Sequence, residues 1–132
     1  MYNVLFLDCD GVIKIGYYFS DTCIDNINTL CREYNLKIVI ISTYRKRPDY
    51  IEMFRDAGIA DDIEIIGRTG DQELTREDEI KKYISEHPNI NKFIIIDDGR
   101  FIDLEKYQVK TYFDYGFDDE KLKEARSLLN KD

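Results

Sequence analysis

An unbroken apolar run leads directly into a pair of acidic residues near the start of the chain. Residues 4–7 are four apolar residues without alternation, and Asp8, Asp10 and Gly11 follow. Such a run, bounded by a turn signal, is typical of a strand buried on both faces in a parallel sheet. The carboxylates then lie at the carboxyl end of the strand, where open α/β sheets bind ligands. They suit a hard cation such as Mg²⁺, although an ordinary turn after a strand is the alternative interpretation.

The size and composition of the chain indicate one domain with its own core. We expect a single domain over residues 1–132, because this length can bury a sizeable core. The composition, 43% hydrophobic and 35% charged, is ordinary for a soluble protein, and no apolar run approaches the ~18 residues that span a bilayer. No signal peptide is visible at the N-terminus. The net charge of −8 argues against a surface that coats nucleic acid generally, but it allows a small basic patch.

The cysteines indicate a reducing environment. Cys9, Cys23 and Cys31 are odd in number and make no metal-type pair. This predicts free thiols and an intracellular, cytoplasmic location. Cys9 stands beside the acidic pair, but a cysteine phosphatase needs an arginine six positions on, and that position is Ile15. We therefore predict that Cys9 is a small buried side chain.

Apolar periodicity predicts that strands alternate with helices along the rest of the chain. An aromatic-rich loop is expected over residues 14–19, before the first helix. Strands that alternate with helices form a parallel sheet with right-handed crossovers. The predicted fold is α/β, a three-layer, doubly wound, Rossmann-like sheet of about five mostly parallel strands. The expected strands are 4–7, 37–41, 63–66, 92–96 and a weaker edge strand at 109–113, and the helices are expected to begin at Ser20 or Asp21, Pro48, Thr75 and Asp118.

Three of the predicted buried strands end in polar residues of particular kinds. Asp8 and Asp10 follow the first strand, Ser42 follows the second, and Asp97 with Asp98 follows the fourth. Because the carboxyl ends of a doubly wound sheet converge on one crevice, we expect these side chains to meet there. Aspartate-based phosphoryl transfer needs such a set: a metal that neutralises charge, a carboxylate that attacks, and a hydroxyl with a cation that holds the phosphoryl oxygens.

These motifs resemble those of haloacid dehalogenase-like (HAD-like) phosphatases. Asp8-Cys9-Asp10-Gly11-Val12 resembles the first motif, Ser42 the second, and Asp97-Asp98 the fourth, in the same order across nearly the whole chain. One branch is most similar: the small phosphatase domains of RNA repair, such as the phosphatase half of polynucleotide kinase-phosphatases. The residues that carry this similarity are Ser42-Thr43-Tyr44-Arg45, Ile66-Gly67-Arg68-Thr69, Arg76 with Glu79-Ile80, and Ile96-Asp97-Asp98.

The resemblance implies roles for the first two motifs. Asp8 is the expected nucleophile, and its other carboxylate oxygen binds Mg²⁺. Asp10 is the expected general acid, which protonates the leaving group and then activates water, while its backbone carbonyl binds the metal. Ser42 and Thr43 are expected to bind the phosphoryl group.

The resemblance also implies a metal ligand in the fourth motif and a cation in the third. Asp98 is expected to ligate the metal directly and Asp97 to support it. The superfamily usually has a lysine as its third motif, and this chain departs from that pattern. Arg76, at the start of the helix before the fourth strand, is the first candidate for this cation, because a helix N-terminus also favours anions. Lys81 and Lys82 are the alternatives.

A basic triplet, residues 45–47, directly follows the predicted phosphate-binding loop. It either grips a second phosphate or a nucleic-acid backbone, or it is a solvated loop. Arg45 is the best candidate for such a grip, since its spacing from Ser42 matches the RNA-repair branch. Some of the nearby aromatic side chains could stack on a base, but most are expected to cover the core: Tyr17, Tyr18, Phe19 and Tyr44.

Neither gap between motifs has room for the cap domain that larger family members carry. An open site admits a bulky substrate, such as a nucleic-acid end or a phosphoprotein loop. The resemblance therefore implies a Mg²⁺-dependent phosphomonoesterase that forms an aspartyl-phosphate and acts on a polynucleotide 3′-phosphate or a nucleotide. Two alternatives remain: a capless, paired-aspartate phosphoprotein phosphatase, and a non-catalytic, receiver-like module that binds phosphate or Mg²⁺. The expected partner is the phosphorylated substrate, with no membrane; the oligomeric state is not predicted.

Overall fold

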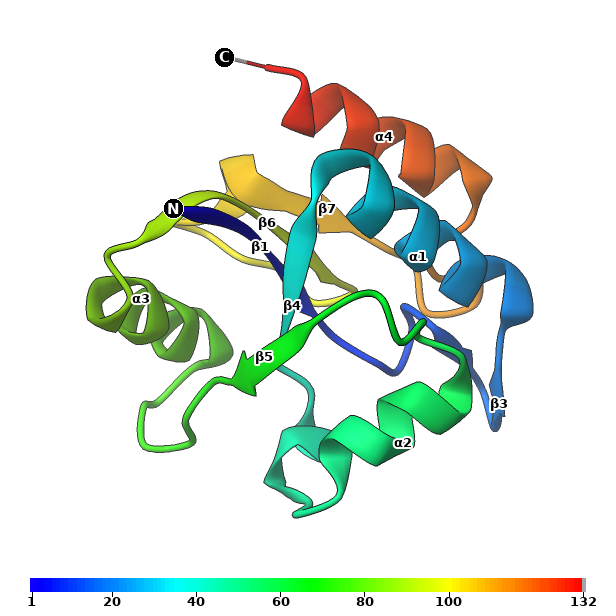
Figure 1. Cartoon of the computed structure of the whole chain (residues 1–132), viewed down its shortest axis with the longest axis horizontal. Helices are drawn as coiled ribbons and strands as arrows, with labels where there is room; N and C mark the ends of the chain where they lie inside the picture. The colour runs from blue at the N-terminus through cyan, green and yellow to red at the C-terminus, as the bar shows by residue number, and fades with distance from the viewer. Residues whose placement is uncertain (132) are drawn as a thin grey trace.

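A single parallel sheet forms the centre of the computed structural model, which describes residues 1–131 (Figure 1). Its strands are β1 (Tyr2–Leu7), β4 (Leu36–Ile40), β5 (Ile65–Arg68), β6 (Ile90–Asp97) and β7 (Gln108–Lys110). All neighbouring pairs are parallel, and the spatial order is β5-β4-β1-β6-β7. The order reverses at β1, so the predicted α/β, doubly wound sheet of five strands is confirmed, with β1 at its centre.

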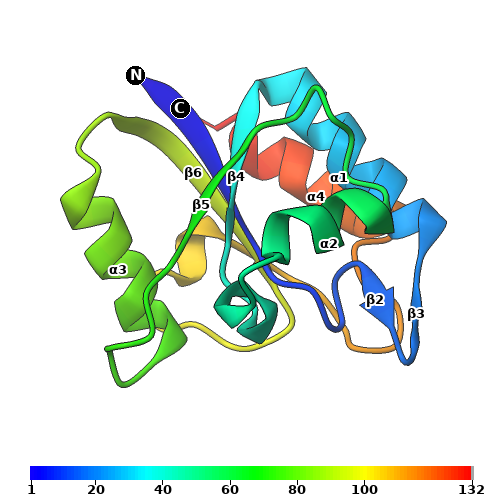
Figure 2. The ribbon, with the colours of Figure 1, turned by 60° about the horizontal axis from the view of Figure 1, so that its bottom comes forward.

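Four helices cover the two faces of this sheet (Figures 1 and 2). They are α1 (Asp21–Tyr34), α2 (Tyr50–Ala57), α3 (Arg76–Glu86) and α4 (Asp119–Leu129). Strand β1, which is buried from Val4 to Leu7, contributes to both cores, because its side chains alternate between the faces. Leu5 and Leu7 pack in the cluster with α1, α2 and α4, whereas Val4 and Phe6 pack in the cluster with α3.

The predicted helix caps are confirmed where they matter for helix position. Ser20 accepts a hydrogen bond from the backbone of Cys23 at the start of α1, and Thr75 accepts one from Asp78 at the start of α3. Such caps satisfy backbone N–H groups that have no partner within the helix. The Thr75 cap therefore fixes Arg76 as the first residue of α3, next to the sheet edge where the polar strand ends lie.

The expected start of α2 at Pro48 is wrong by two residues. The chain first makes a short 3₁₀ turn, η1 (Thr43–Lys46), in which the Ser42 hydroxyl accepts a hydrogen bond from Tyr44 N at 3.1 Å. A second turn follows, and α2 begins only at Tyr50. The serine therefore acts as a local cap, a signal that the search for apolar periodicity overlooked.

The expected aromatic loop at residues 14–19 is a small antiparallel hairpin. Its strands are β2 (Lys14–Ile15) and β3 (Tyr18–Phe19), paired Lys14 with Phe19 and Ile15 with Tyr18. Gly16 adopts a φ of 62° in the two-residue turn. Tight hairpin turns need such a positive φ, which glycine adopts without steric cost.

The other strands lie close to their expected positions but differ in length. β5 and β6 are shifted or extended by about two residues, and β7 is shorter than the expected 109–113, although it is an edge strand as predicted. The chain leaves β7 at Thr111, whose hydroxyl donates to the Gly11 carbonyl at 2.6 Å. Only the hairpin separates β1 from α1, so no cap domain is present at this position in the described chain. No helix within residues 1–131 has the length and apolar character needed to cross a membrane.

Candidate active site

The register between β1 and β6 places two carboxylates side by side. Leu7 pairs with Ile96, and the Asp8 backbone N–H continues the ladder by donating to the Ile96 carbonyl at 3.1 Å. The next residues on the two strands, Asp8 and Asp97, are therefore neighbours on one face of the sheet. Side chains alternate along a strand, and Phe6 packs on the α3 face, so Asp8 also faces α3.

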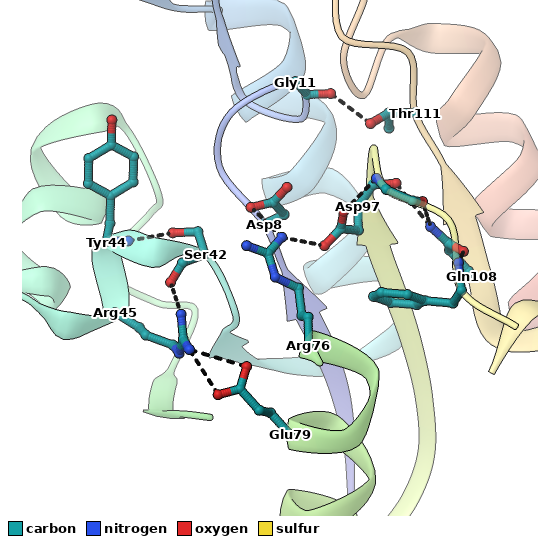
Figure 3. Close-up of polar contacts among 12 residues, drawn as sticks. Asp8, Gly11, Ser42, Tyr44, Arg45, Arg76, Glu79, Asp97, Gln108 and Thr111 are labelled. Carbon is teal, nitrogen blue, oxygen red and sulfur yellow. Dashed lines mark hydrogen bonds and ion pairs between the residues drawn. The ribbon is translucent and has the colours of Figure 1, made fainter. Parts of the chain in front are cut away.

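Arg76 joins these two carboxylates from the first turn of α3 (Figure 3). Its Nη1 lies 2.8 Å from Asp97 Oδ2 and 3.3 Å from Asp8 Oδ1. Both carboxylates are buried, and a buried charge needs a partner of opposite sign. The alternatives for this cation lie elsewhere, because Lys81 pairs with Asp103 and Lys82 with Glu73.

A third carboxylate completes an acidic group that could hold a metal ion. One oxygen each from Asp8, Asp97 and Asp98 lie within 4.8 Å of one another. Asp97 is already engaged through both oxygens, because Oδ1 accepts from the Gly99 N–H at 2.7 Å and Oδ2 accepts from Arg76. One oxygen of Asp98 instead lies within 4.8 Å of an oxygen of Asp8. A cation would therefore find its freest oxygens on Asp8 and Asp98.

The acidic group carries more negative charge than Arg76 neutralises. Burial, and then the neighbouring Asp97, raise the pKa of Asp8 to about 7 against the opposing effect of Arg76. Burial and Asp97 also raise the pKa of Asp98. A divalent cation with oxygen ligands would relieve this repulsion, and Mg²⁺ prefers such ligands. The donor set therefore fits the expected Mg²⁺.

Gly11 makes room for the third carboxylate. Its φ is 75°, in the left-handed region that favours glycine. A Cβ built on Gly11 would lie 2.8 Å from Asp98 Cγ and closer still to Asp98 Oδ2. The glycine of the first motif thus serves two purposes: it turns the chain after β1 and lets the fourth motif approach the backbone.

Gln108 at the start of β7 and Thr111 just after its end fix the loops that carry the carboxylates (Figure 3). Gln108 donates through Nε2 to the carbonyls of Asp97 at 3.2 Å and Gly99 at 2.6 Å. Thr111, fully buried, donates its hydroxyl proton to the Gly11 carbonyl and its backbone N–H to the Asp97 carbonyl at 3.1 Å. Sequence reasoning missed both residues, because a polar residue in a weak edge strand gives no periodic signal.

The phosphate-binding candidates lie on the other side of Asp8. Ile41 N donates to the Leu7 carbonyl at 3.0 Å, so β4 stays paired with β1 up to the last residue before Ser42. Ser42 is buried and its hydroxyl faces η1, whereas Thr43 is exposed at the start of η1. The Thr69 hydroxyl, after β5, is buried without a hydrogen-bond partner among the described residues.

Arg45 has an internal role in the structure rather than the expected exposed grip on a phosphate. Its side chain is buried and forms an ion pair with Glu79 of α3 at 3.0 Å (Figure 3). The remaining guanidinium nitrogens donate to the carbonyls of Ser42, at 3.0 Å, and Gly70. Arg45 therefore holds the loop after β4 onto α3, and the sequence could not reveal the burial that commits it to this contact.

Asp10 lies apart from the acidic group. It is exposed, and it is not among the three carboxylates that could share a cation. Its backbone forms an isolated bridge with Lys14 at the base of the hairpin. The structure thus brings together Asp8, Asp97, Asp98 and Arg76, and leaves the Asp10 carboxylate free to face a substrate.

Cys9, which lies between Asp8 and Asp10 in the sequence, is buried, as predicted. Burial, with Asp10 and Asp8 nearby, raises the pKa of its thiol to about 12, so the thiol stays protonated at neutral pH and the reactive thiolate does not form. All three cysteines are buried free thiols.

The fold and the acidic group together define a HAD-like domain without a cap. In agreement with this, residues 4–122 match the model of the family described as the HAD domain in Swiss Army Knife RNA repair proteins, and the chain belongs to this family. The predicted resemblance to HAD-like domains of RNA repair is thereby confirmed. No curated protein and no solved structure matches the chain.

The buried ion pair predicts that Arg45→Ala destabilises the protein. The substitution leaves Glu79 as a buried charge without its partner, which typically costs about 3–5 kcal/mol. Denaturant unfolding should therefore show a large loss for Arg45→Ala and a change within about 0.5 kcal/mol for the exposed neighbour Lys46→Ala. Equal stability of the two variants would contradict a buried pair.

The different surroundings of the two fourth-motif carboxylates predict unequal effects on metal binding. Asp98→Asn should weaken Mg²⁺ binding by at least about tenfold more than Asp97→Asn, because outer partners of a metal site typically contribute 10–100-fold and direct ligands more. Both substitutions remove one negative charge, so each is the control for the other. Calorimetric Mg²⁺ titration measures the two affinities, and the reverse order would mean that Asp97 is the direct ligand.

The raised pKa of Asp8 predicts how stability depends on pH in the presence of a chelator. Between about pH 4 and pH 7 the folded protein keeps a proton on Asp8 that the unfolded chain has lost, so the free energy of unfolding falls as pH rises. Above pH 7 Asp8→Asn should be more stable than the wild type by roughly 1–4 kcal/mol. This difference in the free energy of unfolding should narrow toward pH 4. The control Asp25→Asn, at an exposed carboxylate, should show no such difference from the wild type.

Proposed function

We propose that this protein is a Mg²⁺-dependent phosphomonoesterase that works through an aspartyl-phosphate on Asp8 and acts on a polynucleotide 3′-phosphate. One observation carries the proposal: Asp8 lies at the carboxyl end of the central strand, beside two further carboxylates and one arginine. Its family membership supports a phosphatase role in RNA repair. A nucleophilic carboxylate in such a site can accept a phosphoryl group and pass it to water.

In the proposed first step the Asp8 carboxylate attacks the phosphorus atom of the ester. The bond from phosphorus to the ester oxygen breaks, and its electron pair goes to that oxygen, which takes a proton from the carboxylic acid of Asp10. In the second step the Asp10 carboxylate takes a proton from water as the water oxygen attacks the aspartyl-phosphate. The bond between phosphorus and Asp8 then breaks, which releases phosphate and restores both aspartates.

The residues around Asp8 have supporting roles in this proposal. Mg²⁺ held by Asp8, Asp98 and the Asp10 carbonyl, with Asp97 in support, would neutralise the phosphoryl charge and keep Asp8 ionised. Arg76 is assigned the role of the family lysine, because it contacts Asp8 and can balance charge that develops on the phosphoryl oxygens. Ser42 and Thr43 are assigned to the phosphoryl oxygens on the β4 side.

The contacts of Lys110 and Arg76 favour catalysis over a receiver-like binding module. A receiver needs a lysine after a late strand, and Lys110 does end β7. Its ammonium group, however, lies 5.0 Å from the centre of the Tyr112 ring, whereas Arg76 occupies the position beside Asp8. The exposed Asp10 carboxylate supports an acid–base step that a receiver lacks.

The absence of a cap from the described fold supports a polymeric substrate. An uncovered site admits the end of a long molecule, whereas a small metabolite would stay exposed to water. The negative charge of the chain opposes a polyanion, but salt screens this field beyond about 8 Å at physiological ionic strength. Contacts close to Asp8 can therefore outweigh it.

The proposed division of labour predicts different defects for the two aspartates of the first motif. Asp8→Asn should abolish phosphate release from a 3′-phosphorylated oligonucleotide in Mg²⁺, because the attacking group is gone. Asp10→Asn should lower the rate on this alkyl ester by about 10²–10⁴-fold. With p-nitrophenyl phosphate, whose leaving group needs no proton, Asp10→Asn should still form the intermediate and accumulate it.

Mass spectrometry of the quenched protein checks this, since Asp10→Asn should gain one phosphoryl group on Asp8 while Asp8→Asn gains none. The exposed variant Asp25→Asn is the matched control and should retain the wild-type rate. Substantial turnover by a folded Asp8→Asn protein would refute the covalent mechanism. A rate for Asp10→Asn within threefold of wild type on the alkyl ester would refute the acid–base role.

A further inference from the structure

The exposed aromatic side chains of this protein are gathered in two loops. The chain has ten tyrosines and seven phenylalanines, and twelve of these seventeen side chains are buried or partly buried. The five exposed ones all lie in the β2–β3 hairpin or in the loop after β7. We call them the aromatic rim: Tyr17, 92% exposed, Tyr18, 80%, Tyr112, 58%, Phe113, 55%, and Tyr115, 68%.

The two backbone segments that carry the rim lie side by side, as both views of the ribbon show (Figures 1 and 2). Phe117 N donates to the Val12 carbonyl at 2.8 Å, and the Tyr115 carbonyl accepts from the Cys23 thiol at 3.5 Å. Gly116 is packed so closely that an added Cβ would lie 2.7 Å from Ile15 Cδ1 in the hairpin. The rim side chains are therefore carried by two adjacent segments.

The rim is also attached directly to the candidate active site. Thr111 immediately precedes Tyr112, and it donates to the carbonyls of Gly11 and Asp97 in the loops that carry the acidic group. The hairpin follows the first motif after only a short turn. A molecule whose end lies at Asp8 would therefore meet these rings with the part next to that end.

Lysine side chains accompany the aromatic rings. Lys110 Nζ and Lys121 Nζ lie 5.0 Å and 4.9 Å from the centre of the Tyr112 ring. In the hairpin, Lys14 Nζ lies 5.7 Å from the centre of the Phe19 ring and donates to the Tyr44 hydroxyl at 3.1 Å. Rings with ammonium groups beside them can hold bases by stacking and the adjoining phosphates by charge.

We propose that the aromatic rim is a stacking platform for the unpaired bases of a single-stranded polynucleotide whose terminal phosphate lies at Asp8. This inference rests on the proposed function, since it names the part of the substrate that lies beyond the phosphate. Unpaired bases offer flat faces of any sequence, so the platform selects single strands without reading sequence. A duplex hides these faces and is not bound in this way.

The rings, rather than net charge, supply the binding in this proposal. The exposed Asp114 lies within the rim, so its charge opposes part of the attraction from Lys110 and Lys121. Binding of single strands should accordingly respond more to loss of a ring than to loss of one lysine. Tyr112 and Phe113, adjacent in the chain and next to Thr111, are the residues to test first.

The test measures binding of an unphosphorylated, fluorescent single-stranded decanucleotide by anisotropy, so that no catalysis is involved. Tyr112→Leu/Phe113→Leu keeps apolar side chains but removes both rings, and it should weaken binding by about 5- to 150-fold, the range for loss of base stacking. Tyr112→Phe, which keeps the ring, should bind within about threefold of wild type. Leu74→Ala, at an exposed leucine outside the rim, is the control and should be unchanged.

A second measurement compares the kcat/KM values for a 3′-phosphorylated decanucleotide and for p-nitrophenyl phosphate. The ratio of the oligonucleotide value to the p-nitrophenyl phosphate value should fall in Tyr112→Leu/Phe113→Leu by a similar factor. In Tyr112→Phe, which keeps the ring, this ratio should stay close to that of the wild type. If no probe releases phosphate but single strands bind in a ring-dependent manner, the proposed function fails and the platform stands. If phosphate is released but the two-leucine variant binds and discriminates as the wild type does, the platform fails and the proposed function stands.

Three further results would overturn the platform. The first is no binding of the wild type to the single strand, and the second is equally strong binding of a duplex of the same length. The third is a dimer, detected by sedimentation, that the two leucine substitutions dissociate, because the rim is then a contact between copies of the chain. A folded two-leucine variant, checked by circular dichroism, is required for each comparison.

Discussion

The site depends on one electrostatic constraint: two carboxylates are buried side by side at the carboxyl ends of β1 and β6, which are neighbours in the sheet. Asp8 and Asp97 share a face because β1 and β6 are in register, and that face is covered by α3. Such a pair cannot stay ionised without positive charge nearby. Arg76 supplies one positive charge, and Asp98 adds a further negative group, so all three carboxylates can be ionised together only when a further cation joins them.

Helix α3 carries both contacts that organise the site. Arg76 holds the carboxylates of β1 and β6, and Glu79, three residues later on the same helix face, holds Arg45 after β4. The helix thus links the acidic side of the site to the loop that presents Ser42 and Thr43. A shift of α3 would therefore disturb both sides of the site at once.

The opposite side of the site is built differently. There the contacts are hydrogen bonds from Gln108, the first residue of β7, and from Thr111, just after the strand, which hold the loops that carry Asp97 and Gly11. Beyond these bonds the chain presents the aromatic rim instead of a cap domain. The described chain therefore combines a buried, charged group of side chains with a neighbouring surface of exposed aromatic side chains.

The sequence by itself determined the fold class and the acidic set. Unbroken apolar runs define the buried strands, and the aspartates that follow them must lie at one edge of a parallel sheet, because all its strands point the same way. Only the tertiary structure decided which cation meets Asp8 and what Arg45 contacts. Periodicity places Arg76 and Lys81 on one predicted helix, but burial and strand register decide which charges come within a few ångströms of each other. The aromatic rim likewise became visible only in the tertiary structure, because the sequence does not distinguish a tyrosine that covers the core from one that faces solvent.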